Sequence, residues 1–310
     1  MKYTSINGLK ISKLSLGTAQ LGFDYGIANV SGKPNLDKSF EILKTAFNAG
    51  INCFDTAPSY GDSEEIIGSF VGDISDEESP IICTKLKIEF DDGTNSVEIY
   101  QQVKQNVEGS MRRLQMKKIP ILLLHSASNM TDNGGLILQS LIRLKNEGMV
   151  DKIGVSVYSP KEVIKAIDLG VFDAIQIPIN IFDHRLIDSG ILNSLKQHNF
   201  IVFARSIFLQ GLFFLDPEAL PENLKLAREP LITLRKLAQK YEIDIAEMAV
   251  SFVRDLPERS SMVIGAETSA QVLNNCDLIE CPKLSDELKD EILNVFNDLP
   301  EKIINPSLWN

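Results

Sequence analysis

The 310 residues are 44% hydrophobic and 24% charged, as in an ordinary globular protein with a full core. The net charge of −11 argues against a general nucleic-acid-binding or anionic-membrane-binding surface. The N-terminal sequence lacks the apolar core of a signal peptide, and no apolar run approaches the roughly 18 residues of a membrane span. We therefore expect a cytoplasmic protein without a nucleic-acid or membrane partner.

The chain opens with a predicted β-hairpin whose two-residue turn is Asn7-Gly8. Strand-like apolar runs and helical segments then alternate without a linker between them. The predicted strands span residues 14–16, 52–55, 80–85, 119–125, 152–157, 174–178, 199–205 and 262–264. The predicted helices span residues 36–49, 63–71, 97–114, 136–147, 160–170, 187–197, 230–241, 245–256, 270–275 and, at the end, 285–299.

Strands that are apolar on both faces and alternate with helices indicate a parallel sheet, and eight such units indicate a closed barrel. We predict an α/β fold, one (β/α)8 TIM barrel domain over residues 1–310, with an N-terminal β-hairpin and a C-terminal helix. The alternative is a doubly wound sheet. It would need a GxGxxG turn after the first strand, and the turn here, LGTAQLGFDYG, does not match that pattern.

Candidate active-site residues of a barrel lie at the C-terminal ends of its strands. Those ends carry Gly17, Thr18, Asp55, Lys85, His125, Ser156, Gln176 to Asn180, Arg205, Ser206 and Gly265. Three consecutive strands thus end on an ionisable side chain, and Tyr60 follows in the turn after the first of these. Because side chains alternate along a strand, each of the three shares a face with a small or apolar residue, as a packed barrel interior requires.

Each of these four residues also has a structural explanation. Asp55 could cap the turn that follows it, and Lys85 could extend into water. His125 could be a hydrogen-bonded core histidine, and Tyr60 a half-buried aromatic residue. Their coincidence at one end of adjacent strands favours a shared site.

Metal binding is not predicted, because one histidine, one aspartate and one lysine do not form a ligand set. The other two histidines, His184 and His198, lie in loop or helix-end settings, where we expect them to be solvated. The four cysteines form no CxxC pair, which is typical of free thiols in a reducing compartment.

The four grouped residues suit proton donation to a carbonyl. A free tyrosine has a pKa near 10, which is too high for ready proton release at neutral pH. We expect the ammonium of Lys85 to lower the pKa of Tyr60, and Asp55 to hold the lysine in place. His125 would orient the carbonyl or help to pass the proton. Because the sequence contains no hydride source, a redox reaction requires a nicotinamide cofactor.

The segment DTAPSYGDSEEIIG, residues 55–68, resembles the signature of the aldo-keto reductase superfamily, in which Asp, Tyr, Lys and His form a catalytic tetrad. The spacing of Asp55 and Tyr60 fits that signature, as do Thr84-Lys85 and the LLLH run that ends at His125. The later segments GLILQSLIRLKNEGMVDKIGVSVYS, QIPIN, FARSIFLQGL and VIGAETSAQVLNN are also similar to the family. The resemblance covers roughly residues 3–280.

The resemblance implies that NADPH or NADH binds across the barrel mouth and exchanges a hydride with a carbonyl. Tyr60 would be the acid, Lys85 its pKa modifier, Asp55 the partner of the lysine, and His125 the residue that orients the carbonyl oxygen. The implied cofactor contacts are Gly17 and Thr18; Ser156, Gln176 and Asn180 at the carboxamide; Ser206, Leu209 and Gly211 at the diphosphate; and Gly265, Thr268, Gln271 and Asn275 at the adenosine end.

Three features depart from the family pattern. Val157 follows Ser156 where an asparagine is usual, and Arg205 stands where an aromatic ring commonly stacks on the nicotinamide. A planar guanidinium could stack in its place. Glu267 and Gln271 stand where basic residues usually hold the 2′-phosphate of NADP, so NADP preference is in doubt and NAD is possible. Basic residues could instead come from the 206–228 segment, for example Lys225 or Arg228.

We predict an NAD(P)-dependent oxidoreductase that reduces an aldehyde, ketone or keto-sugar carbonyl to an alcohol. One alternative is a nucleotide-binding barrel with a mainly regulatory or interaction role. Another is a cofactor-free lyase or isomerase that uses Lys85 through a Schiff base. The loops after Lys85, His125 and Arg205 are expected to set specificity, and the short, polar sequences of the first two indicate a small polar carbonyl substrate. We expect a monomer or a weak oligomer.

Overall fold

The computed structural model describes residues 1–72, 74, 79–91, 93–256 and 260–309. It begins with the predicted hairpin, in which β1 (Tyr3–Ile6) pairs antiparallel with β2 (Leu9–Ser12). The turn residues Asn7 and Gly8 have φ values of +50° and +79°, as a tight two-residue hairpin turn requires. The expected hairpin is confirmed.

The remaining strands form a closed parallel barrel in the order β10-β3-β4-β5-β6-β7-β8-β9, with β9 paired to β10. The barrel strands are β3 (Leu14–Gly17), β4 (Cys53–Asp55), β5 (Ile81–Leu86), β6 (Ile119–Leu124), β7 (Val150–Ser156), β8 (Ala174–Pro178), β9 (Ile201–Arg205) and β10 (Ser261–Gly265). The (β/α)8 prediction is therefore confirmed, and the doubly wound alternative is wrong.

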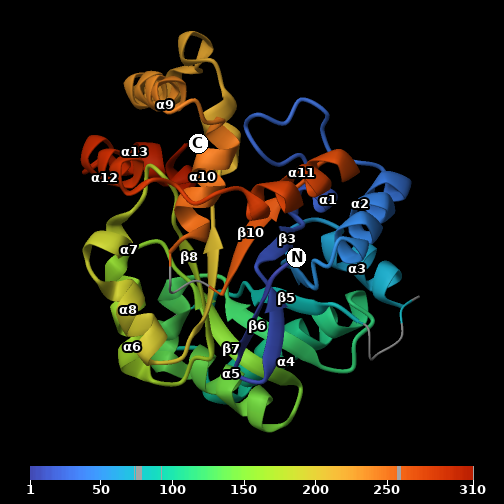
Figure 1. Cartoon of the computed structure of the whole chain (residues 1–310). Helices are drawn as coiled ribbons and strands as arrows, with labels where there is room; N and C mark the ends of the chain where they lie inside the picture. The colour runs from blue at the N-terminus through green and yellow to red at the C-terminus, as the bar shows by residue number, and fades with distance from the viewer. Residues whose placement is uncertain (73, 75–78, 92, 257–259, 310) are drawn as a thin grey trace.

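Helices surround the barrel (Figure 1). They are α1 (Ala19–Gly22), α2 (Leu36–Asn48), α3 (Ser63–Val71), α4 (Ser96–Arg113), α5 (Leu136–Asn146), α6 (Pro160–Leu169), α7 (Arg185–Asp188), α8 (Ile191–Gln197), α9 (Arg228–Lys240), α10 (Ile245–Arg254), α11 (Ser269–Glu280), α12 (Asp286–Val295) and α13 (Glu301–Ile304). Among the described residues, none of these helices combines the length and apolar character needed to cross a bilayer.

Two predicted helices are broken in the structure. The segment 187–197 is divided between α7 and α8, because Gly190 between them has a φ of +68°. The C-terminal segment 285–299 is helical only to Val295, and Asp298 has a φ of +60°. A left-handed residue ends a helical hydrogen-bond ladder, and only the glycine was a visible signal of it in the sequence.

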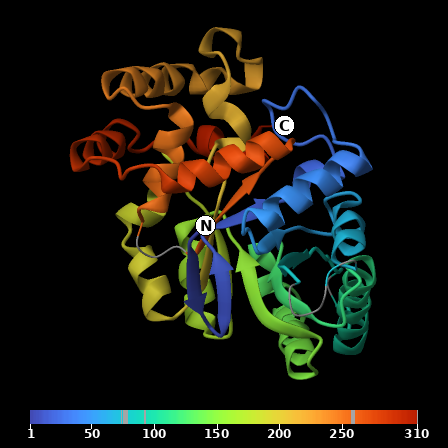
Figure 2. The same ribbon diagram turned by 45° about the vertical axis from the view of Figure 1, so that its right-hand side comes forward.

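The barrel interior is packed with side chains. Buried side chains from five barrel strands, including Cys53, Cys83 and Phe203, form one cluster, and Ile11 of the hairpin packs into it. Figure 2 shows the dark-blue hairpin at the opposite end of the molecule from the blue loop that follows β3. The hairpin thus covers the N-terminal end of the barrel and leaves the C-terminal ends of the strands for a site.

Candidate active site

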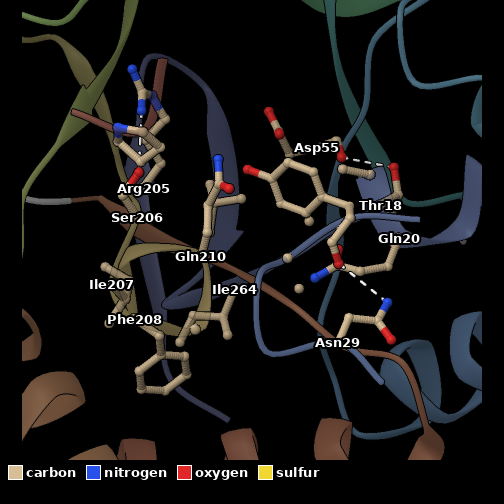
Figure 3. A pocket seen from close by; sticks show the side chains of 18 of the residues that line it. Thr18, Gln20, Asn29, Asp55, Arg205, Ser206, Ile207, Phe208, Gln210 and Ile264 are labelled. Atoms are coloured by element: carbon tan, nitrogen blue, oxygen red, sulfur yellow. Dashed lines mark hydrogen bonds between the residues drawn. The ribbon is translucent and has the colours of Figure 1, made fainter. Parts of the chain in front are cut away.

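The C-terminal ends of the barrel strands open into a cavity of about 680 Å³, a size typical of small-molecule and cofactor sites. Figure 3 shows Thr18 and Asp55 on one side of it, Arg205 and Ser206 on the other, and Gln210 between them. Tyr60 and His125 also line the cavity, whereas Lys85 is buried beneath it with 1% of its surface exposed.

The ammonium of Lys85 is fully hydrogen-bonded inside the barrel. It donates to both carboxylate oxygens of Asp55 and to the backbone oxygen of Thr56, each at 2.9 Å. An ammonium has three donors, so these bonds use all of them. Oδ1 of Asp55 also accepts a 2.8 Å hydrogen bond from Nε2 of Gln176.

Lys85 is consequently a fixed buried cation. Burial is the largest single influence and lowers its pKa, but the charge of Asp55, with further contributions from Tyr60, Cys83 and the hydrogen bond to Asp55, together raise it by more. The net result is a pKa above the ordinary lysine value. A Schiff base requires a neutral, accessible amine, so this geometry argues against a lyase or isomerase that attacks with Lys85.

The ring of Tyr60 lies directly above this cation, with Nζ of Lys85 4.8 Å from the ring centroid. Burial raises the pKa of the Tyr60 hydroxyl and the charge of Lys85 lowers it, and the effect of burial is larger. The lowering by Lys85 expected from the sequence is present, but the expected net decrease in pKa is wrong. The sequence does not show how deeply the ring is buried. At neutral pH the phenol is a neutral proton donor.

The turn that carries Tyr60 packs against α1 with no room for a side chain. A Cβ on Gly22 would lie 1.6 Å from the backbone oxygen of Tyr60, and a Cβ on Gly61 would lie 2.2 Å from that of Gly22. The backbone N–H of Tyr60 donates to Ala57 O at 2.9 Å, and its oxygen accepts from Ser63 N at 3.0 Å. These contacts fix the backbone of Tyr60, and with it the position of the ring.

His125 follows β6 and completes the group, with its ring 6.0 Å from the ring of Tyr60 in an edge-on arrangement. Burial lowers the pKa of His125, and the charges of Lys85, Lys87 and Arg205 lower it further, to about 3. The imidazole is therefore neutral at physiological pH and can donate or accept one hydrogen bond toward the cavity. The sequence correctly predicted that Asp55, Lys85 and His125 end neighbouring strands.

Ten of the residues expected around the cofactor line the cavity: Gly17, Thr18, Ser156, Gln176, Arg205, Ser206, Gly211, Gly265, Gln271 and Asn275. Three others do not. Asn180 is fully buried, and its Oδ1 accepts hydrogen bonds from the backbone N–H groups of Phe182 and Asp183. Leu209 lies in the hydrophobic core, and the side chain of Thr268 caps α11.

The loop after β3 supplies cavity residues that were not expected from the sequence, among them Tyr25 and Asn29. It meets the 3-10 segment Leu209–Phe214, because Ile27 N donates to Gln210 O at 3.0 Å. The two backbones also pack closely, since a Cβ on Gly211 would lie 2.7 Å from that of Ala28. The run DYGIANVSGK is rich in turn-forming residues, which was the signal for an ordered loop.

Further unexpected lining residues are Tyr158, Ile207, Phe208, Gln210, Phe214, Pro306 and Ser307. The loops after Lys85 and His125, which we expected to set specificity, contribute no described residue beyond His125 to the lining. Of the three expected specificity loops, the one after Arg205 is the only one whose described residues line the cavity beyond His125. The loop after β3 and the C-terminal segment also contribute lining residues.

Arg205 stacks on a ring from its own protein. The guanidinium carbon lies 4.2 Å from the ring centroid of Tyr158. Its terminal nitrogens donate to the hydroxyl of Ser206 at 3.2 Å and to Val157 O at 3.1 Å. One face of the guanidinium is therefore covered, and the side chain is half-buried.

Glu267 lies at the other end of the cavity, between β10 and α11. Its backbone N–H donates to Oε1 of Gln271 at 2.6 Å, and burial raises the pKa of its carboxyl. The two basic residues proposed to replace missing phosphate ligands lie elsewhere and are paired: Lys225 with Glu222, and Arg228 with Glu218 and Glu229.

Two expectations about residues outside the cavity have different outcomes. His184 is 3% exposed, and its Nδ1 lies 3.0 Å from Asp188, so the expectation that it is solvated is wrong. It precedes the short helix α7, where packing against the barrel buries it. All four cysteines have free thiols, as expected.

A family model described as the Aldo/keto reductase family matches residues 13–295. A relative named "Uncharacterized oxidoreductase YqkF", from Bacillus subtilis (strain 168), is 26% identical over 292 residues, which cover 89% of this chain and 93% of the relative. Among solved structures, the glycerol dehydrogenase AKR11B4 of Gluconobacter oxydans is 26% identical with a TM-score of 0.71, covering 96% and 98% of the two chains. The holo form of the aldo-keto reductase AKR11C1 of Bacillus halodurans shares the fold, with a TM-score of 0.75, 21% identity and full coverage of both chains.

Proposed function

Because this chain belongs to the aldo/keto reductase family of NAD(P)-dependent oxidoreductases, we propose that it reduces an aldehyde, ketone or keto-sugar to an alcohol with Tyr60 as the proton donor. The observation that carries the proposal is the convergence of Tyr60, His125 and the Lys85–Asp55 pair on one cavity.

A nicotinamide dinucleotide fits the residues that line this cavity. The cavity extends from Asp55 at the end of β4 to Asn275 in α11, which suits a long ligand. Its far end carries neutral amides and hydroxyls, including Ser206, Gln271 and Asn275, which match the donors and acceptors of a dinucleotide. We assign the cofactor to the expected residues that line the cavity, apart from Arg205, with Ser156 and Gln176 at the nicotinamide end.

In the proposed reduction, the cofactor supplies the hydride and the protein supplies the proton. When bound, the reduced nicotinamide supplies the hydride that reaches the carbonyl carbon. Tyr60 gives its proton to the carbonyl oxygen, so the product is an alcohol. The charge of Lys85 stabilises the resulting phenolate, Asp55 holds that charge in place, and neutral His125 donates a hydrogen bond that orients the carbonyl oxygen.

We also propose that NADH binds at least as tightly as NADPH. Among the described residues, Arg205 is the one lysine or arginine that lines the cavity, and it stands at the end of β9 rather than beside Glu267. A 2′-phosphate near Glu267 would meet a carboxylate and no compensating cation.

The test is separate fluorescence titration of NADH and NADPH with the purified protein. We expect both affinities to be measurable and NADH to bind no more weakly than NADPH. A Glu267→Arg variant should shift the ratio at least tenfold toward NADPH. The absence of binding of either nucleotide at millimolar concentration would reject the proposed function.

A second experiment tests the role of Tyr60 with the variant Tyr60→Phe, which removes only the hydroxyl. We expect it to bind nucleotide as the wild type does and to lose most of its turnover. Turnover that persisted in Tyr60→Phe would reject Tyr60 as the proton donor. Absence of turnover in the wild type, with nucleotide still bound, would favour a nucleotide-binding barrel with a regulatory role.

A further inference from the structure

Arg205 has an unusual environment for a cation at the wall of a cavity. Its side chain is half-buried, and among the described residues no carboxylate lies within ion-pair distance of it. Its two hydrogen bonds go to uncharged oxygens, of Ser206 and Val157. Partly buried charges in proteins are normally paired, so a guanidinium in this state is suited to an anionic ligand in the cavity.

The side chain of Arg205 has N–H groups that its two described hydrogen bonds do not use. A guanidinium has five N–H groups, and the two described bonds leave donors unused. Its planar fork matches the two oxygens of a carboxylate or a phosphate. Stacking on Tyr158, at 4.2 Å, and the bond to Val157 O hold the fork in one orientation, so little side-chain freedom is lost when an anion binds.

Tyr25 adds a second donor on the same cavity. It comes from the loop after β3, and its ring makes an edge-on contact with Phe23 at 5.5 Å, which in turn lies 6.1 Å from Tyr60. Burial, and then the neighbouring Tyr60, raise the pKa of Tyr25 to about 12, so the hydroxyl is a neutral donor at physiological pH. No hydrogen bond is made by this hydroxyl within the described part of the chain.

The field of Arg205 reaches the reacting position. Arg205, Tyr25, Tyr60 and His125 line the same cavity, and the charge of Arg205 lowers the pKa of each of the other three. Among the described lining residues, Asp55 is the carboxylate at this end, and it is already bound to Lys85 and Gln176. As far as the structure describes it, the substrate end of the cavity therefore presents hydrogen-bond donors and no unpaired carboxylate.

We propose that this end of the cavity is an anion subsite: the substrate is a carbonyl compound bearing a carboxylate or a phosphate, which Arg205 binds and to which Tyr25 donates a second hydrogen bond. This inference rests on the proposed reductase function and narrows its substrate class. The net charge of −11 does not prevent binding of an anionic substrate, because the attraction to Arg205 is local and confined to the cavity.

The test compares matched aldehydes that differ in charge alone. 4-Carboxybenzaldehyde and 4-formylbenzamide have nearly the same shape, and glyceraldehyde 3-phosphate is compared with glyceraldehyde to separate phosphate from carboxylate. We expect kcat/KM of the wild type to favour the anion at least tenfold in one of the two pairs, chiefly through KM. Terephthalate should also inhibit competitively with the aldehyde, and terephthalamide should not.

Variants then test which residues cause the preference for the anionic aldehyde. Arg205→Gln should reduce the preference for the anion to twofold or less, and Arg205→Lys should restore part of it. Tyr25→Phe should reduce the preference several-fold with little change in KM for the nucleotide. Lys87→Gln is the matched control, because Lys87 is exposed, lies near His125 and does not line the cavity; its preference should equal that of the wild type.

Three outcomes would overturn the inference. Equal turnover of charged and neutral aldehydes by the wild type would reject it while leaving the reductase function intact. An Arg205→Gln variant that weakens nucleotide binding but keeps the anion preference would assign Arg205 to the cofactor. Absence of both nucleotide binding and turnover of any aldehyde would reject the reductase function and the anion subsite together.

Discussion

The low pKa of His125 makes the stability of this protein depend on pH in a way that one substitution can isolate. The folded pKa is about 3, whereas an unfolded histidine has a pKa of about 6.5. Below pH 6.5 the unfolded chain therefore binds a proton at this residue, and the folded chain does not until the pH approaches 3. The contribution of His125 to stability is complete above pH 6.5 and is lost as the pH falls.

The size of this loss in folding free energy follows from the difference between the folded and unfolded pKa values of His125. At pH 5.5 the unfolded histidine is about 90% protonated and the folded one is almost neutral, so folding is weakened by about 1.4 kcal/mol relative to pH 8. The lower pH is kept above the isoelectric point of about 4.9, where low net charge promotes precipitation.

The assay is urea unfolding at pH 8.0 and pH 5.5, followed by far-ultraviolet circular dichroism, for the wild type and His125→Gln. Glutamine is polar and does not titrate, so other groups contribute equally to both proteins. We expect the wild type to lose about 1.4 kcal/mol more than the variant between the two pH values. Equal losses would refute the reasoning. So would a histidine ring resonance, assigned by its absence from the spectrum of the variant, that shifts between pH 8 and pH 5.5.

Three further predictions concern the groups around His125. Because the pKa of Tyr60 lies above its ordinary value, the rate of carbonyl reduction should not fall with tyrosine ionisation until the pH exceeds about 10; a pH–rate profile with an alkaline limb near 7 would contradict this. Gly22→Ala should displace Tyr60 and lower kcat at least tenfold, whereas Gly109→Ala, in α4, where the atom nearest to a Cβ would be Nη1 of Arg113 at 3.3 Å, should leave kcat within twofold. Asp55→Asn should cost about 3–5 kcal/mol in urea unfolding by leaving Lys85 buried and unpaired, and adding Lys85→Met should recover most of that loss; a double variant no more stable than Asp55→Asn would contradict it.

The barrel and the four central residues could be predicted from sequence because both depend on local, periodic signals. Strand ends are marked by a change from apolar to polar residues, and a parallel barrel brings all such ends to one face. Asp55, Lys85 and His125 each stand at such a change, so topology alone groups them. Their residue types, rather than their geometry, then indicated the chemistry.

The remainder of the site depends on contacts between distant segments, for which the sequence has no periodic signal. Tyr25 reaches the cavity because the backbone of Ile27 bonds to that of Gln210, 183 positions later in the numbering. Pro306 and Ser307 line the cavity because the C-terminal segment returns to the barrel mouth, where the indole of Trp309 donates to Lys302 O. Likewise, the burial that sets the pKa of Tyr60 is a property of the assembled cavity.

In the proposed mechanism, the groups that would perform the reaction are separate from those that would select the substrate, and the two sets are in contact at one point. Asp55 and Lys85 lie on barrel strands and are held by mutual hydrogen bonds, so their positions are insensitive to the loops. Tyr25 lies in the loop after β3, and changes there should alter which carbonyl compound is accepted. The same stretch begins with α1, however, and Gly22 of that helix contacts the backbone of Tyr60. Substitutions along this loop should therefore change specificity alone when they fall beyond Gly22, and both specificity and rate when they displace it.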